Sequence, residues 1–316
     1  MDLLTQPKYE LKEPFKLTNY GKRFIFPTQE LVKGLEELII FTENKMNWDI
    51  PNGCVFVYND KMKYNPKILK SDVGCGISSA IIPKLEYSDD QIMDILRVVN
   101  EINVHIGQGN HFIDFTVGHP SLRSKNMESN MIFLHSDFNE HKIIPLSYEE
   151  AKNLESECKH KRIDYLEKVF DLLGIRGNIY KDWVHNSVSK EEGRLIYRKG
   201  SINVNETDGI GALALNPVEG FYLYSANFDR YYGSMQHGTG RIGSKGSVLS
   251  FFQKKKSGIA RSLLIGRSIG KFYIDNTLKR NLYETYNSME GFKNNFRWEQ
   301  NMVGYCVPEL VISTKR

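Results

Sequence analysis

The chain has 316 residues, of which 41% are hydrophobic, 12% aromatic and 25% charged, with a formal net charge of +4. This composition excludes collagen-like, disordered and disulfide-scaffold classes, and the small positive charge allows a polyanionic partner without requiring one. The apolar runs are too short to cross a bilayer, so we expect no membrane partner, and the start of the chain predicts no secretory signal. Four widely spaced cysteines are too few for a disulfide framework and indicate a reducing, cytoplasmic compartment.

Three helices are predicted from apolar periodicity and capping signals, over 28–45, 88–103 and 147–174. Ser88 and Ser147 each open a capping box, because a glutamine or glutamate follows three residues later. The first helix has no such box and is predicted from its apolar face alone.

Short runs of β-forming residues lie between and after these helices. They are 54–58, 77–82, 183–188, 195–197, 221–224 and 310–313. Helices and strands interleave irregularly, without the strict alternation of a doubly wound sheet, and this predicts an α+β fold. No repeat or linker divides the sequence, so we expect a single large mixed-sheet domain over residues 1–316.

The first segment that could carry chemistry is the glycine-rich turn 71–76. Asp72 and Cys75 stand three residues apart in it, and a carboxylate and a thiolate on one turn can hold a divalent ion, while a thiolate can bridge two. The alternative is an ordinary turn in which Cys75 is a small core residue.

Three histidines lie at the ends of short strand-like segments. His111 follows a glycine-rich turn and leads into a run in which Asp114 falls on the opposite face, and His135 and His185 each follow apolar residues. A lone histidine is usually a hydrogen-bonded polar residue, but strand ends are common positions for ligands that converge. With the carboxylate and thiolate of the turn 71–76 these imidazoles form a set that suits Mn²⁺, Zn²⁺ or Fe²⁺ better than Mg²⁺.

A second glycine-rich segment, 232–246, contains His237, Arg241 and Lys245. Exposed backbone N–H groups, hydroxyls and cations bind polyphosphates, although the segment is not a Walker A loop. An imidazole within such a segment is placed to attack phosphorus. The alternative is a surface loop without chemistry.

The order of these motifs resembles that of the RtcB family of RNA ligases, from about residue 50 to the end of the chain. The matching segments are Asp72–Gly76, Gly109–Asp114, His135-Ser136, His185-Asn186, Arg198–Gly200, His237–Arg241 and Lys315. The resemblance implies a domain of RtcB type with the metal and nucleotide site in a central cleft.

The activity that the resemblance implies joins a 3′-phosphate or 2′,3′-cyclic phosphate RNA end to a 5′-hydroxyl end, with GTP and Mn²⁺. His237 would take GMP from GTP, the guanylate would pass to the RNA 3′-phosphate, and the 5′-hydroxyl would then attack and expel GMP. The divergence of this chain from the family favours repair of cleaved RNA, in particular tRNA, over tRNA splicing, and an archease-like activator would be a further partner.

The resemblance also implies a set of binding residues. Cys75 would bridge two manganese ions, and two cations are suited to an in-line displacement at phosphorus. The other metal ligands would be Asp72 and His111 for one ion, and His135 and His185 for the second. The nucleotide contacts would be Asn110, Asp114, Asn186, Gly238, Thr239, Gly240, Arg241 and Lys315.

Several motifs depart from the family pattern. Asp114 replaces a glutamate, Phe221 stands where a serine contacts guanine, and the residues after Ser136 lack an arginine that binds the RNA end. These departures predict weaker selection of guanine and altered recognition of RNA ends. Two alternatives therefore stay open: a metal-dependent phosphodiesterase or nucleotidyl-modifying enzyme, and an RNA-end-binding protein without ligation.

Overall fold

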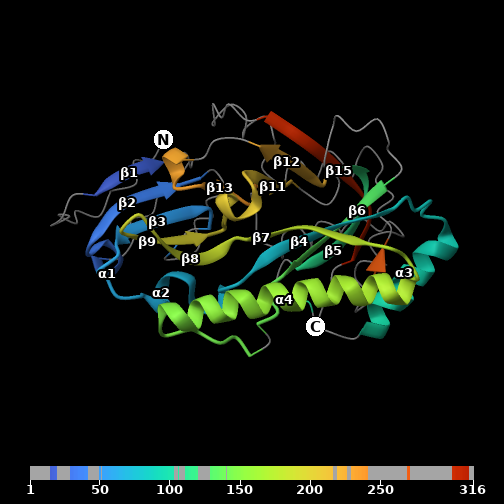
Figure 1. Ribbon diagram of the computed structural model, residues 1–316, viewed down its shortest axis with the longest axis horizontal. Coiled ribbons are helices and arrows are strands. Elements are labelled where there is room, and N and C mark those ends of the chain that lie inside the picture. Colours follow the sequence, from blue (N-terminus) through green and yellow to red (C-terminus); the bar gives the residue numbers. More distant parts are fainter. Residues whose placement is uncertain are drawn as a thin grey trace, which may run out of the picture.

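The computed structural model is a mixed α+β fold, mostly sheet with a few helices (Figure 1). The residues that it describes are 15–19, 29–41, 50, 52–102, 106, 111–119, 129–139, 141–215, 219–225, 229–240, 269–270 and 301–312. Among the helices of these ranges, none is both long and apolar enough to cross a membrane. The prediction of one domain over residues 1–316 stays a prediction.

Two larger sheets and one two-stranded sheet make up the described strands. The five-stranded sheet has the order β1 (Lys16–Asn19), β2 (Leu35–Ile40), β3 (Cys54–Asn59), β9 (Arg194–Lys199) and β8 (Asn186–Glu191). The eight-stranded sheet has the order β11 (Ile210–Ala214), β12 (Phe221–Ser225), β15 (Asn301–Ile312), β5 (Phe112–His119), β6 (Ser129–Ser136), β4 (Gly76–Pro83) and β7 (Asn178–Val184), with β14 (Ile269–Gly270) beside β15. The short pair is β10 (Ser201–Asn203) with β13 (Ser234–Gln236).

The larger sheet nearly closes on itself. The indole N–H of Trp183, on β7, donates a hydrogen bond of 2.8 Å to the carbonyl oxygen of Ile210, the first residue of β11. These two strands stand at opposite ends of the strand order, so this contact brings the ends of the sheet together.

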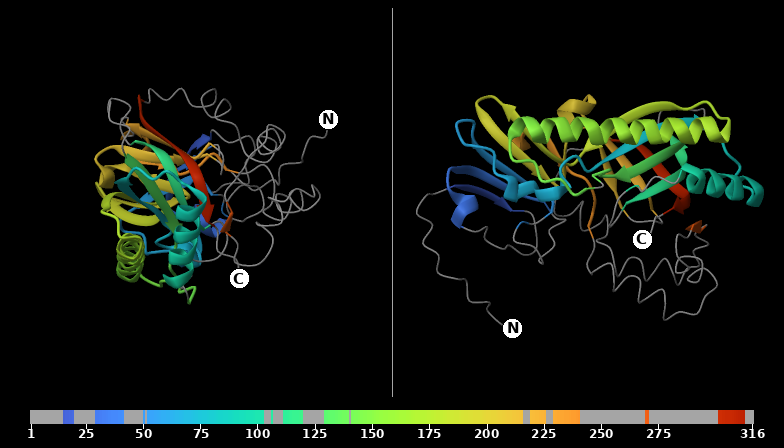
Figure 2. Two further views of the ribbon diagram at one scale, coloured as in Figure 1. Left: turned by 90° about the vertical axis from the view of Figure 1, so that its right-hand side faces the viewer. Right: turned by 90° about the horizontal axis from the view of Figure 1, so that it is seen from below.

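The described α-helices are α1 (Gln29–Val32), α2 (Pro66–Leu69), α3 (Asp89–Ile102) and α4 (Tyr148–Leu173), and three short 3₁₀ turns cover Lys70–Asp72, Val204–Thr207 and Asp229–Tyr231. The longest helix, α4, runs across strands of both larger sheets (Figure 2). Its first half packs Leu154 and Cys158 against the five-stranded sheet, and its second half packs Leu166 and Val169 against the eight-stranded sheet.

Local sequence signals account for the ends of α4. The hydroxyl of Ser147 accepts a hydrogen bond of 3.1 Å from the backbone N–H of Glu150, as the capping box predicts. Gly174 ends the helix in the left-handed conformation, with φ of 63°. The predicted helices over 88–103 and 147–174 are thus confirmed in type and closely in extent, and most predicted strands coincide with β3, β4, β9, β12 and the end of β15.

The prediction of a helix over 28–45 was wrong. Of the described residues in this range, 29–41, only Gln29–Val32 is α-helical, and Leu35–Ile40 is strand β2. Gly34 lies between the two segments with φ of +71°, a conformation that ends a helix. The apolar residues assigned to a helical face instead fill a strand whose two faces are both covered, since Leu38, Ile39 and Ile40 are all buried.

The predicted strand over 183–188 is also corrected, because the chain leaves one sheet and enters another within it. β7 ends at Val184 in the eight-stranded sheet, and β8 begins at Asn186 in the five-stranded sheet. His185 is the single residue between them, so it lies where the two larger sheets meet.

Glu155 makes a polar contact between α4 and the five-stranded sheet. Its carboxylate accepts hydrogen bonds from the backbone N–H of Val188, at 2.8 Å, and from the ammonium group of Lys152, at 2.5 Å. Burial raises the pKa of Glu155 from 4.5 to about 7, although both contacts oppose the shift. The carboxyl group therefore binds its proton more tightly in the folded protein than in the unfolded chain.

We expect this group to make the protein less stable as pH rises from about 4.5 to about 7, because the unfolded chain loses the proton first. The free energy of unfolding should fall by at most ~3 kcal/mol over this range from Glu155 alone. Glu155→Gln cannot titrate and should flatten the profile. Denaturant titrations at several pH values measure the slope, and equal slopes for both proteins would contradict the assignment.

Candidate metal centre

Antiparallel pairing brings four segments of the chain to one end of the eight-stranded sheet. β4 and β5 begin at this end, while β6 and β7 end at it, because β4 is antiparallel to both β6 and β7, and β5 to β6. Cys75 directly precedes β4, and His111 directly precedes β5. His135 is the next-to-last residue of β6, and His185 follows β7. Four expected metal ligands therefore lie at one edge.

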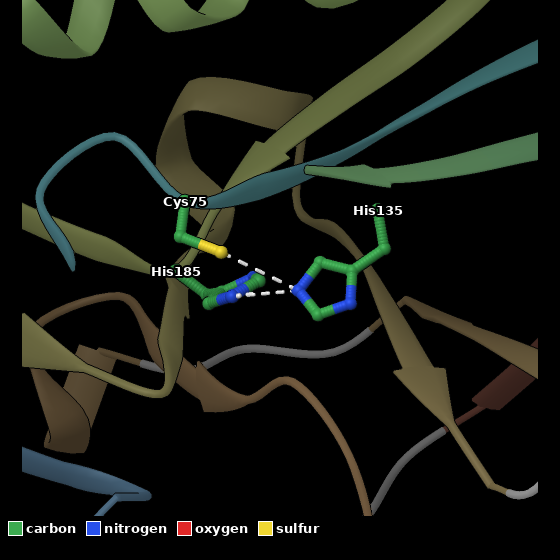
Figure 3. A group of neighbouring side chains, drawn as sticks. All are labelled: Cys75, His135 and His185. Carbon is green, nitrogen blue, oxygen red and sulfur yellow. Dashed lines mark hydrogen bonds between the residues drawn. The ribbon is translucent and has the colours of Figure 1, made fainter. Parts of the chain in front are cut away.

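The donor atoms of Cys75, His135 and His185 converge (Figure 3), and His111 joins them at the sulfur of Cys75. The sulfur of Cys75 is 3.5 Å from Nε2 of His111 and 3.4 Å from Nε2 of His135. Nε2 of His135 is 3.3 Å from Nε2 of His185. The ligand atoms of Cys75, His135 and His185 all lie within 4.8 Å of one another, and all four residues are buried.

These separations fit the ligands of one metal ion. A tetrahedral ion with metal–nitrogen distances of about 2.0 Å and a metal–sulfur distance of about 2.3 Å separates two nitrogens by about 3.3 Å, and a nitrogen from a sulfur by about 3.5 Å. The pairs Cys75–His135 and His135–His185 match those values. His111 meets the group at the sulfur, so the thiol contacts the imidazoles of both His111 and His135, as a bridging ligand requires.

Burial favours the uncharged forms of these groups. It raises the pKa of the Cys75 thiol well above its ordinary value, although the guanidinium of Arg162 opposes the shift. Burial also lowers the pKa of His185 well below its ordinary value, and the neighbouring His237 and His135 act in the same direction. His185 is therefore a neutral imidazole, the form that binds metals, and a bound cation would favour the Cys75 thiolate.

His237 lies beside this group, directly after β13. Its ring stacks on that of His185, with centroids 4.2 Å apart and an angle of 23° between the planes. Its Nδ1 is 2.8 Å from the carbonyl oxygen of Gly200. Because a carbonyl oxygen only accepts, Nδ1 carries the hydrogen, and Nε2 is the lone-pair nitrogen of the neutral ring.

Gly200 is held in place for this contact. It has φ of +66°, and a Cβ at this position would lie 2.6 Å from the backbone nitrogen of Gly53. Its own N–H donates a hydrogen bond of 2.8 Å to Oδ1 of Asn186. Asn186, expected to contact the nucleotide, therefore supports the backbone that orients His237.

Asp72 is the one expected metal ligand outside this cluster. Its side chain is 52% exposed, and its Oδ2 pairs with the ammonium group of Lys199 at 3.1 Å. Its backbone carbonyl oxygen accepts a hydrogen bond from the N–H of Cys75, so the turn between them is closed. This partner could not be predicted from the sequence, because Lys199 is 127 residues away.

The expected nucleotide contacts are described in part. Asp114 is buried on β5, burial raises the pKa of its carboxyl group well above the ordinary value, and its Oδ1 has no hydrogen-bond partner among the described residues. Thr239 is buried and bonded to the backbone of Ala214 and Leu215, beside Gly238 and Gly240. Asn110, Arg241 and Lys315 lie outside the described residues.

Sequence reasoning missed Arg162, whose guanidinium lies behind the cluster and contacts the backbone beside two of the ligands. A signal for it exists: Arg162 stands four residues after Cys158 and four before Leu166, on the inward face of α4. A charged residue on an apolar face of a helix indicates a buried partner.

Comparison with known proteins adds no assignment. No protein-family model matches the chain, and no curated protein matches it significantly. The functional argument therefore depends on the residues of the cluster.

We expect Cys75→Ala to lose more metal than His111→Ala, because the sulfur contacts the imidazoles of both His111 and His135, whereas His111 meets the cluster at the sulfur. Metal content per chain, measured after loading with Mn²⁺ or Zn²⁺ and gel filtration, tests this. His160→Ala is the matched control, since His160 is exposed on α4. Full metal content in Cys75→Ala would contradict the bridging role.

Proposed function

We propose that the protein is a GTP- and Mn²⁺-dependent RNA ligase of RtcB type, with its metal and nucleotide site in a central cleft. It would join RNA 3′-phosphate or 2′,3′-cyclic phosphate ends to 5′-hydroxyl ends through a histidine–GMP intermediate. Its role would be RNA repair, with cleaved tRNA as one substrate.

The observation that carries the proposal is the position of His237 against the cluster of metal-ligand side chains. Its ring stacks on His185, and its Nδ1–H is bound by Gly200, so the lone pair is on Nε2. A site that only binds metal has no need of an oriented imidazole beside it. A site for nucleotidyl transfer needs both a nucleophile and cations close to the same phosphate.

The proposed reaction has three transfers at phosphorus. Nε2 of His237 attacks the α-phosphorus of GTP, and pyrophosphate leaves. An oxygen of the RNA 3′-phosphate then attacks the phosphorus of the guanylate, which releases the imidazole and forms an anhydride. The 5′-hydroxyl oxygen of the second RNA end attacks the RNA phosphorus, loses its proton and expels GMP. A cyclic phosphate end must first be opened by water.

The chain's own residues would divide these tasks. Cys75, His111, His135 and His185 would hold manganese, with Asp72 as a further ligand after release from Lys199. When bound, the metal supplies positive charge that offsets the charge developing on the phosphate oxygens. Gly200 keeps the hydrogen of His237 on Nδ1, and Asp114 with the segment 238–240 would contact the nucleotide.

A metal-dependent phosphodiesterase or nucleotidyl-modifying enzyme is the second candidate. The observation that favours it is the segment after His135, where the family has an arginine for the RNA end. Here Asp137 is buried and pairs with Lys142, and the Asn139 amide donates to the backbone oxygens of Ser71 and Ile143. These described side chains are committed to internal contacts, and the cation among them, Lys142, is already paired with Asp137.

Removal of the nucleophile should abolish nucleotide transfer and leave metal binding intact. His237→Ala should form no covalent adduct with labelled GTP and should seal no 3′-phosphate to a 5′-hydroxyl, while it retains its metal. His160→Ala should behave as wild type in both assays. The adduct should be acid-labile and stable to base, as a phosphoramidate is. A GMP adduct on His237→Ala would contradict the assignment, and an adduct without sealing in wild type would favour the second candidate.

Selection of GTP over ATP should be weak. Phe221 is 1% exposed and stacks on Phe133 with ring centroids 4.0 Å apart. Its side chain therefore packs in the core and has no hydroxyl group that could bond to a guanine base. One lost hydrogen-bonded pair to a base edge is worth about 1–3 kcal/mol, or roughly ten- to a hundredfold in preference. Competition between unlabelled ATP and labelled GTP in adduct formation measures it. If excess unlabelled ATP did not reduce adduct formation at all, other residues would have to select guanine.

A further inference from the structure

Arg162 lies at the middle of α4, between the half that packs on the five-stranded sheet and the half that packs on the eight-stranded sheet. Its side chain is fully buried. Burial of a guanidinium costs free energy unless its N–H donors are hydrogen-bonded, so the hydrogen-bond partners of Arg162 indicate its role in the structure.

Two of those partners are backbone carbonyls next to expected metal ligands. Nη1 of Arg162 donates to the oxygen of Gly74 at 2.6 Å and to the oxygen of Ser136 at 2.9 Å. Gly74 directly precedes Cys75, and Ser136 directly follows His135. One nitrogen therefore ties together the two backbone segments whose side chains meet at 3.4 Å between sulfur and Nε2.

The third partner extends the same contact to β7. The carboxylate of Asp182, itself buried, accepts hydrogen bonds from Nε of Arg162 at 2.8 Å and from Nη2 at 3.0 Å, which makes a bidentate ion pair. It stands three residues before His185 on the strand that carries that histidine. Nε also donates to the hydroxyl of Ser78 on β4.

The surrounding backbone is shaped around the guanidinium. A Cβ on Gly76 would lie 2.7 Å from Nη2 of Arg162, so a glycine at the start of β4 leaves room for it. Replacing a buried ion pair by well-packed apolar residues is often neutral or stabilising, so stability alone is weak reason for this arrangement. The contacts of Arg162 with Gly74, Ser136 and Asp182 suggest another role, which is to fix the spacing of the three strand ends that carry these residues.

We propose that Arg162 is a positioning residue for the metal centre: it sets the separation of Cys75, His135 and His185 by binding the backbone beside the first two and the strand before the third. The inference rests on the proposed metal site and not on ligation. It predicts that loss of the guanidinium group of Arg162 weakens metal binding more than loss of the guanidinium group of another fully buried arginine.

The chain offers a matched control in Arg198, which is equally buried. Its guanidinium binds Glu191, Ser189, Ser234 and the carbonyl oxygen of Tyr232. None of these four residues adjoins Cys75, His111, His135 or His185 in the chain. Arg162→Lys and Arg198→Lys therefore make the same chemical change, one at an arginine that binds the backbone beside two clustered ligands and one at an arginine whose side-chain partners adjoin none of the four.

The experiment titrates full-length, chelator-treated protein with Co²⁺ and follows the thiolate-to-cobalt absorption band, while denaturant unfolding measures the stability of each variant. Arg162→Lys should bind Co²⁺ about 10- to 100-fold more weakly, with an altered band, as is typical when the support of a ligand is lost. Arg198→Lys should lose stability but keep the wild-type affinity and band. Equal affinities in the two variants would overturn the proposal.

Asp182→Asn keeps the guanidinium and weakens its bidentate pair, so it serves where Arg162→Lys does not fold. It should weaken Co²⁺ binding in the same direction, and wild-type affinity and band in this variant would overturn the proposal. Failure of the proposed function has a different signature, because wild-type protein would then bind Co²⁺ but seal no RNA. Sealing by wild type together with unchanged affinity in Arg162→Lys would overturn the inference and leave the function standing.

Discussion

The antiparallel pairing of β4, β5, β6 and β7 is the constraint on which the candidate site depends. In an antiparallel pair the start of one strand lies beside the end of the other, so residues far apart in sequence become neighbours at one end of the sheet. Cys75 and His111 enter at this edge as their strands begin, and His135 and His185 as theirs end. β10 and β13 then add Gly200 and His237 from the adjoining two-stranded sheet.

The sequence predicted the parts of this site that depend on strand ends and missed the parts that depend on tertiary contacts. His135 and His185 were found because apolar runs precede them, and Cys75 because of its glycine-rich turn. The prediction of a helix over 28–45 was wrong although the apolar periodicity fits a helix. Gly34 ends the helix, and the apolar residues after it form a strand that is buried on both faces. Lys199 opposite Asp72 and Arg162 behind the cluster could not be placed, because only the fold brings such distant residues together.

With a metal ion bound as proposed, the balance of charge around the cluster would favour an anionic ligand. Arg162 is neutralised by Asp182, and Lys199 by Asp72. The remaining donors are imidazoles, which are neutral when they bind metal, and one thiol. A divalent ion held by a thiolate and imidazoles would keep a net positive charge in a buried setting, where the field is screened little by water.

The spacing of the ligands along the chain gives a bound ion a second role, that of a crosslink. Cys75 is 36 residues from His111 and 60 from His135, and His135 is 50 from His185. An unfolded chain would have to close all of these loops to bind one ion, and each closure costs entropy. Capture of the ion would therefore come at the end of folding, after synthesis has passed His185, and the free energy of binding would stabilise only the completed fold.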